Sequence, residues 1–84
     1  MLKVRFFASI REALDCAQMD IAFEAAGGDL DALQARLVAS GGGSWGEILG
    51  RENMIRAVNQ QVIDGNCPLA DGDEVAFFPP VTGG

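Results

Sequence analysis

The amino-acid sequence predicts an α+β roll, in which one main helix packs against one face of a sheet. Three observations predict this fold. Residues 2–9 alternate apolar and polar side chains, which is the period of a half-buried strand. Residues 30–39 repeat apolar side chains at helical spacing. A second strand pattern, Glu74–Phe78, stands directly before Pro79 and Pro80.

Length and charge limit the functions that this chain can have. Its 84 residues, 49% of them hydrophobic, are enough for one small domain that folds without staples. The net charge of −6 argues against a nucleic-acid partner, which needs a basic face, and favours a basic protein partner. The sequence has no histidine, which excludes imidazole acid–base chemistry and histidine-ligated metal sites.

The two cysteines, Cys16 and Cys67, are far apart in the sequence and match no metal-ligand or redox spacing. We expect both to be reduced, structural thiols. Lys3 and Arg5 interrupt the apolar N-terminus, so it does not resemble a signal peptide. No apolar run is long enough to span a membrane. We therefore expect a cytoplasmic protein with no membrane partner.

The first strand has a clear inner and outer face. The inward set is Leu2, Val4, Phe6 and Ala8. The same alternation leaves Phe7 on the outer face, which is unusual for so large an apolar side chain. Ser9 is placed to cap a short helix at residues 10–14, and residues 19–25 are expected to form a second strand.

The middle of the chain predicts two further helices. Asp29 is placed to cap the main helix at residues 30–39. The glycines at 41–43 lack the lysine and the strand–loop–helix context of a phosphate-binding loop, so we interpret them as a flexible stop. Ser44 then begins a short helix, in which Trp45 is expected to fill the core rather than to bind a ligand.

The second half of the chain predicts three strands. Residues 54–60 form the third strand, and residues 62–63 form a short edge strand that the turn at 64–66 ends. In the final strand, Glu74–Phe78, alternation directs Phe78 outward.

The chain is expected to divide into a domain at residues 1–78 and a flexible tail at 79–84. Pro79 and Pro80 end the last strand because neither has an N–H to donate to the sheet. Six extended residues span roughly 20 Å, and Gly83 and Gly84 have no side chains. Such a tail could place a carboxylate in a narrow channel of another protein, although a frayed terminus is the ordinary alternative.

Three segments resemble the small, sulfur-carrying subunit of molybdopterin synthase. They are Val4-Arg5-Phe6-Phe7-Ala8, Ala57-Val58-Asn59-Gln60 and the closing run from Pro68 to Gly84. The resemblance implies a ubiquitin-like β-grasp fold with a mixed sheet, one main helix and short extra helices. It also implies that the first and last strands lie side by side and parallel at the centre of the sheet.

The resemblance implies a role for the terminal glycine. An E1-like enzyme uses ATP to adenylate Gly84, and a sulfur donor protein then supplies sulfur to form a thiocarboxylate. The tail enters the large synthase subunit and donates sulfur to cyclic pyranopterin monophosphate, which becomes the dithiolene of molybdopterin. By the same resemblance, two small subunits bind a dimer of large ones, and Gly83 keeps the tail slim. The chain itself is then a carrier that binds no cofactor, with the catalytic groups in the large subunit.

The implied strand pairing makes the outward Phe7 and Phe78 neighbours, and we expect them to form a partner-binding patch extended by Val62. The tail residues Pro79, Pro80, Val81 and Thr82 complete the expected contact. Three alternatives stay open: a sulfur carrier for thiamine or another pathway, a ubiquitin-like protein modifier, and a small binding module with an incidental tail. A thiocarboxylate or an isopeptide bond at Gly84 would distinguish the carriers from the modifier.

Overall fold

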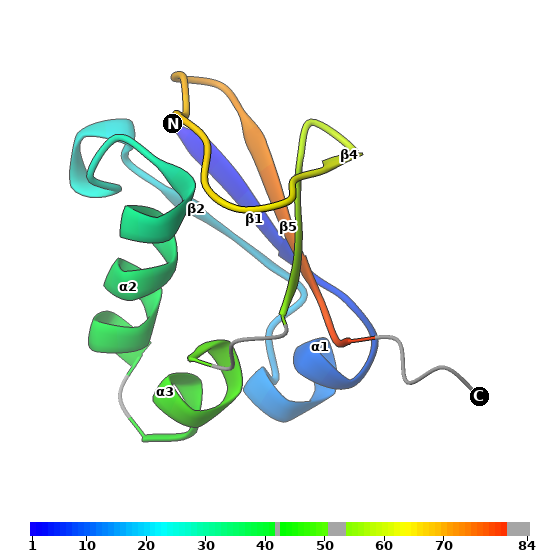
Figure 1. Ribbon diagram of the computed structural model, residues 1–84. Helices are drawn as coiled ribbons and strands as arrows, with labels where there is room; N and C mark the ends of the chain where they lie inside the picture. Colours follow the sequence, from blue (N-terminus) through cyan, green and yellow to red (C-terminus); the bar gives the residue numbers. More distant parts are fainter. Residues whose placement is uncertain (42, 51–53, 81–84) are drawn as a thin grey trace.

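Five strands form one mixed sheet in the computed structural model, which describes residues 1–41, 43–50 and 54–80 (Figure 1). They are β1 (Leu2–Phe6), β2 (Gln18–Ile21), β3 (Ile55–Val58), β4 (Gln61–Val62) and β5 (Glu74–Phe78). Their order across the sheet is β2-β1-β5-β3-β4. The first and last strands pair in parallel, whereas the other neighbours are antiparallel. This confirms the α+β fold and the central, parallel pairing of the first and last strands.

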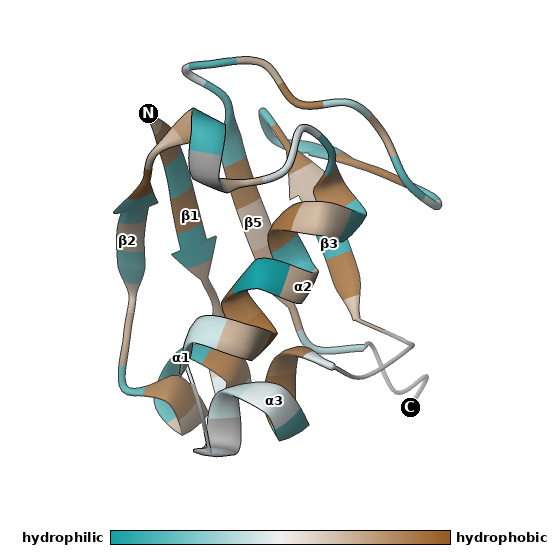
Figure 2. Ribbon diagram, turned by 90° about the vertical axis from the view of Figure 1, so that its left-hand side faces the viewer, coloured by the Kyte–Doolittle hydropathy of each residue, from teal (hydrophilic) through white to brown (hydrophobic). Residues whose placement is uncertain are grey.

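The helices leave one face of the sheet open. They are α1 (Ala8–Leu14), the short 3-10 helix η1 (Phe23–Ala25), α2 (Leu30–Gly41) and α3 (Gly43–Leu49). Figures 1 and 2 show α2 and α3 on the same side of the sheet, with α1 at the end of the sheet where α3 lies. Among the described residues, none of these helices is long and apolar enough to cross a membrane.

The core lies between the sheet and the helices α2 and α3. Its fully buried large side chains are Leu2, Val4, Phe6, Leu30, Leu33, Leu37, Leu49, Val75 and Phe77. The Phe6 and Phe77 rings stack with their centroids 5.9 Å apart. Trp45 meets Phe6 edge-on at 5.6 Å, an arrangement that suits the quadrupoles of the two rings. The expectation that Trp45 fills the core is therefore confirmed.

The N-terminus of α2 is capped from two segments of the chain. Asp29 Oδ1 accepts a hydrogen bond from the Ala32 N–H at 2.8 Å, which confirms the predicted cap. Asn66 Oδ1 accepts one from the Asp31 N–H, also at 2.8 Å. These contacts satisfy N–H groups that have no partner within the helix, and they attach the loop after β4 to α2.

Two predicted boundaries in the first half are wrong. The first short helix begins at Ala8 and no side chain caps it, because Ser9 already lies inside the first turn. The second strand ends at Ile21, and Phe23 lies in η1 rather than in the sheet. Ile21 pairs with Leu2, the first residue of β1, so the strand ends where β1 offers no further partner.

Two further boundaries differ in the second half. The third strand ends at Val58, and the edge strand is Gln61–Val62, because Asn59 and Gln60 form the turn between them with φ of 51° and 68°. Helix α2 extends through Gly41, so the predicted glycine stop begins too early. A Cβ at Gly41 would lie 2.3 Å from Cγ of Trp45, which shows that glycine permits the close approach of α3.

Candidate functional site: the open face of the sheet

Phe7 and Phe78 form a stacked pair on the face of the sheet that α2 and α3 leave open. Their ring centroids are 4.6 Å apart and their planes differ by 7°. The parallel register pairs Phe6 with Phe77, so the next residue along each strand reaches the opposite face beside its neighbour. Both side chains are partly exposed. The outward orientation predicted for each phenylalanine is confirmed.

A depression lies beside this pair, and its floor is made of alanine. Ala57 and Ala76 are paired across β3 and β5 and are 3% and 8% exposed. Neither belongs to the core cluster on the helix side, so larger neighbours on the open face shield them. The depression has a volume of about 280 Å³. Its lining residues are Arg5, Phe7, Ala57, Gln60, Val62, Glu74, Ala76 and Phe78.

A second depression of about 390 Å³ continues the first toward the tail. Its lining residues are Ala8, Ile55, Val62, Phe78 and Pro79. Because Val62 and Phe78 line both depressions, we treat the two as one surface and call it the outer groove. Val62 is 68% exposed, as expected for a residue that extends the patch. The groove ends at Pro79, the first residue of the predicted tail.

Polar groups border the outer groove at its β1 side. The Arg5 guanidinium lies over the Phe7 ring, 5.1 Å from its centroid. Its Nη1 atom is 3.4 Å from Oε1 of Glu74. Both charged side chains remain substantially exposed to water, so this ion pair contributes little to folding stability. It does hold Arg5 over the Phe7 ring.

The hairpin between β3 and β4 is fastened to the start of β5. The Asn59 side chain donates to Asp73 Oδ1 and accepts from the Glu74 N–H, both at 3.0 Å. Asp73 Oδ2 accepts from the Ala70 N–H at 2.8 Å. The Ala70 N–H, followed by the Asn59 amide, holds the pKa of Asp73 below its ordinary value, against a smaller opposing effect of burial. This network anchors the hairpin that carries Gln60.

Seven residues of the groove were not predicted from the sequence: Arg5, Ala8, Ile55, Ala57, Gln60, Glu74 and Ala76. Gln60 had been assigned to a strand, and the alanines offer no chemical signal by themselves. The paired register could have found Ala57 and Ala76, since strand alternation directs both to the face that Phe78 occupies.

Of the predicted tail residues, Pro79 and Pro80 directly follow β5 and are partly buried. The other four lie outside the described residues: Val81, Thr82, Gly83 and Gly84. Their roles, and the division of the chain at residues 78 and 79, therefore stay predictions.

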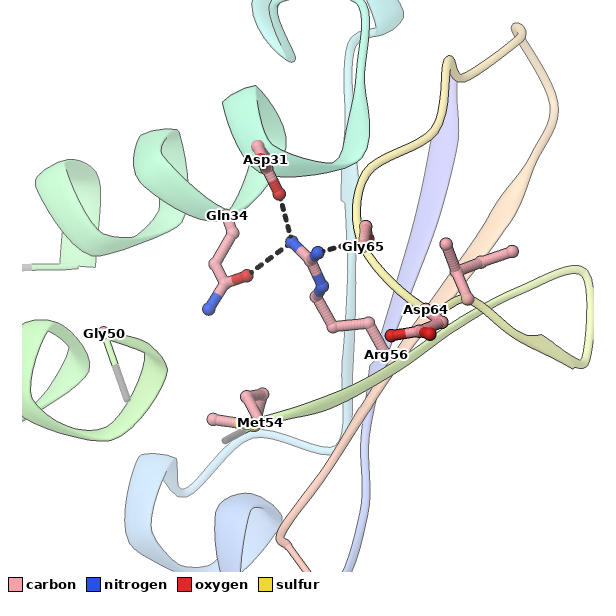
Figure 3. A pocket seen from close by; sticks show the side chains of 8 residues that line it. Asp31, Gln34, Gly50, Met54, Arg56, Asp64 and Gly65 are labelled. Carbon is pink, nitrogen blue, oxygen red and sulfur yellow. Dashed lines mark hydrogen bonds and ion pairs between the residues drawn. The ribbon is translucent and has the colours of Figure 1, made fainter. Parts of the chain in front are cut away.

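A different pocket, of about 450 Å³, opens on the helix side of the sheet (Figure 3). Arg56 projects into it and donates to the Asp31 carboxylate at 2.6 Å and to Gln34 Oε1 at 3.0 Å. It also donates to the carbonyl of Gly65. The Asp31 carboxylate balances the charge of the guanidinium, which joins β3 to α2 and to the loop that contains Gly65. We assign this pocket a structural role.

The fold and the groove together define a class: a small ubiquitin-like β-grasp protein whose open sheet face leads to its C-terminal segment. Residues 4–84 match the ThiS family. The molybdopterin synthase sulfur carrier subunit of Escherichia coli (strain K12) is 40% identical over 84 residues, which cover all of both chains. The corresponding subunit of Haemophilus influenzae is 38% identical over 86 residues, again with full coverage of both. The chain belongs to the ThiS family and, within it, to the molybdopterin synthase sulfur carrier subunits.

Solved structures agree with this assignment. A complex of subunits 1 and 2 of the molybdopterin-converting factor from Helicobacter pylori 26695 contains a chain with 36% identity and a TM-score of 0.65. The match covers 99% of this chain and 97% of that one. Small archaeal modifier protein 1 of H. volcanii matches 95% of this chain and 97% of its own at a TM-score of 0.62, with 24% identity, and supports the fold alone. The predicted resemblance is confirmed.

Proposed function

We propose that this sulfur carrier works through a thiocarboxylate at Gly84, whose sulfur atom is transferred to cyclic pyranopterin monophosphate to form the molybdopterin dithiolene, leaving the carboxylate on the chain. The observation that carries the proposal is the outer groove, an apolar surface that extends to Pro79. A partner bound in this groove would lie beside the root of the tail and could receive the terminal carboxylate in its own active site.

The chemistry at Gly84 requires activation before sulfur enters. A carboxylate oxygen is a poor leaving group, so an E1-like enzyme first transfers AMP from ATP to the carboxylate and releases pyrophosphate. Hydrosulfide released by a donor protein then attacks the acyl carbon, forms the carbon–sulfur bond and displaces AMP, which leaves the thiocarboxylate. Sulfur is suited to this attack because it is a good nucleophile that needs no strong base near neutral pH. A terminal glycine leaves the acyl carbon uncrowded.

The large subunit of molybdopterin synthase is the proposed occupant of the outer groove. The relative from H. pylori was solved as a complex of two subunits. This chain has no histidine for acid–base catalysis, so we place the catalytic groups in that partner and assign this chain no bound cofactor. Its charge of −6 favours fast association with a basic surface. We propose a heterotetramer of two small and two large subunits.

We place the protein in the cytoplasm. Cys16 and Cys67 are both free and partly buried, and unpaired thiols persist in a reducing compartment.

Mass spectrometry of two chains tests the proposed chemistry. One chain ends at Gly84 and the other carries one additional alanine, and each is incubated with the activating enzyme, ATP and sulfide. We expect sulfur only on the chain that ends at Gly84, because an added residue moves the carboxylate and crowds it. Deletion of Gly84 should also abolish sulfur transfer while the melting temperature stays nearly unchanged.

Three results would contradict the proposal. Sulfur found on Cys16 or Cys67 would mean that a cysteine, and not the terminal glycine, carries the sulfur. Equal labelling of the extended chain would show that the terminal position does not matter. An isopeptide bond from Gly84 to a lysine of another protein would identify a modifier instead.

A further inference from the structure

The floor of the outer groove is unusual for the centre of a sheet. Strand positions favour β-branched and aromatic side chains, which fill the pleated surface. Here Ala57 and Ala76 face each other on β3 and β5, two neighbouring strands in the interior of the sheet. The register extends this row to Arg5 on one side and Val62 on the other. The two alanine methyl groups therefore lie between larger side chains. The depression is the space that larger side chains would fill at these two positions.

The size of the depression indicates what fits there. Small-molecule sites usually enclose about 300–1,000 Å³ and bury most of their ligand. The alanine-floored depression has about 280 Å³ and opens to solvent on the unpaired face. It is thus open rather than enclosing, unlike a typical cofactor site, and it can receive one large apolar side chain.

The walls have the composition of a protein contact. Phe78 and Val62 supply apolar walls, while Arg5, Glu74 and Gln60 stand at the margin. An apolar centre within a polar margin is the usual arrangement around an energetically dominant contact between proteins, because the margin excludes water from the centre.

The backbone of Gln60, at the margin of the depression, has an unusual conformation. It has a φ of 68°, in the left-handed region that side chains other than glycine and asparagine rarely occupy. The Asn59 contacts to Asp73 and Glu74 hold this turn in place. The glutamine side chain is therefore kept at the margin of the depression at a cost in backbone strain.

We propose that the depression over Ala57 and Ala76 is a socket for a single bulky aliphatic or aromatic side chain that projects from the large synthase subunit. The inference rests on the proposed function, because it takes the large subunit as the partner. Continuity of the groove with Pro79 favours this occupant, because a subunit that receives the tail comes close to the groove. The socket sets the position of the partner relative to the root of the tail.

Filling the socket from within tests this proposal. Ala76→Leu places an isobutyl group in the depression and removes no side chain from the core cluster. The matched control is Ala35→Leu, the same change on α2 at an exposed position away from the open sheet face. Isothermal titration calorimetry measures the affinity of each full chain for the purified large subunit, and circular dichroism measures its melting temperature.

We expect Ala76→Leu to weaken binding by roughly 10- to 100-fold, the range expected for loss of one well-packed contact. Ala35→Leu should bind like the unchanged chain, and both variants should stay folded. If Ala76→Leu does not fold, Ala57→Val narrows the same socket with a side chain that suits a strand. The proposal would be overturned if a folded variant with the socket filled binds the large subunit as tightly as the chain without substitutions. It would also be overturned if the chain without substitutions does not bind the large subunit.

The measurements distinguish an error in the socket from an error in the proposed function. If Gly84 is not the sulfur carrier, the unchanged chain itself shows no thiocarboxylate by mass spectrometry. If only the socket is wrong, the unchanged chain carries sulfur and the filled variant binds the large subunit normally.

Discussion

Two pairs of phenylalanines lie at the ends of β1 and β5 and have opposite surroundings. Phe6 and Phe77 stack at 5.9 Å on the helix side of the sheet. Phe7 and Phe78, one residue further along the chain in each case, stack at 4.6 Å on the open side. Each pair takes one residue from the Phe6-Phe7 dipeptide and one from Phe77-Phe78, because consecutive side chains of an extended segment point to opposite faces.

Burial separates the two pairs. Phe6 and Phe77 are 1% and 0% exposed and are covered by the chain's own helices and by Trp45. The outer pair is only partly buried and borders the outer groove. The inner pair therefore gains its hydrophobic stabilisation during folding, whereas part of the apolar surface of the outer pair stays in contact with water. We propose that a partner covers this surface.

The largest effect is expected from Phe77→Ala. Loss of a fully buried ring leaves a cavity and should lower the free energy of unfolding by about 3–5 kcal/mol. That is a large share of the roughly 5–15 kcal/mol that stabilises a typical domain. Urea denaturation measures this loss in the free energy of unfolding. A loss below about 1 kcal/mol would mean that the inner pair does not support the fold.

Phe78→Ala should show the opposite distribution of effects. We expect its affinity for the large subunit to fall by about 1–3 kcal/mol, because an interfacial aromatic side chain is lost. Its unfolding free energy should fall by less than that of Phe77→Ala, because the ring is already partly hydrated. Calorimetric titration and urea denaturation of both variants complete the comparison. Unchanged affinity in a folded Phe78→Ala chain would assign the outer pair to folding alone.

A smaller change of opposite sign is expected at the hairpin beside the outer pair. Gln60→Gly should raise the free energy of unfolding by up to about 1 kcal/mol, because glycine adopts a φ of 68° without strain. Asn59→Gly is the matched control. Its φ is also positive, at 51°, but its side chain bonds to Asp73 and Glu74, so that variant should lose stability. If both variants lose stability in urea denaturation, strain at Gln60 is not the cause.

Much of the comparison was predictable from local pattern. Alternation in the first and last strands correctly directed Phe7 and Phe78 outward, and Asp29 was correctly identified as a helix cap. These features depend on residues close together in the sequence. The resemblance of three segments to a known family supplied the parallel pairing that makes the outer phenylalanines neighbours.

The features that sequence analysis missed depend on distant contacts or weak turn signals. β2 ends at Ile21 because its partner strand begins at Leu2, which local pattern does not reveal. The turn at residues 59–60 lacks the Asn-Gly pair that is typical of such hairpins, so the strand was extended through it. Gly41 permits the approach of Trp45, which depends on how two helices meet.

The smallest effect is expected at the opposite end of β5 from both aromatic pairs. Asp73 accepts hydrogen bonds from the Ala70 N–H and the Asn59 amide, which lower its pKa. A carboxylate whose pKa is lower in the folded chain stabilises that chain above its unfolded pKa, about 3.9. The contribution is lost as the pH falls below that value and through the folded pKa.

Asp73→Asn should therefore flatten the decline of stability at acidic pH. At pH 7 the variant should lose less than about 1 kcal/mol, because solvent screens a contact at this partly exposed position. Urea denaturation at intervals from pH 7 down to pH 3 measures both chains. Affinity for the large subunit at pH 7 should fall less than for Ala76→Leu, because the network supports only the margin of the socket through Asn59. Parallel pH profiles would show that Asp73 is not the group responsible, and a loss of affinity as large as that of Ala76→Leu would show that the margin matters as much as the socket.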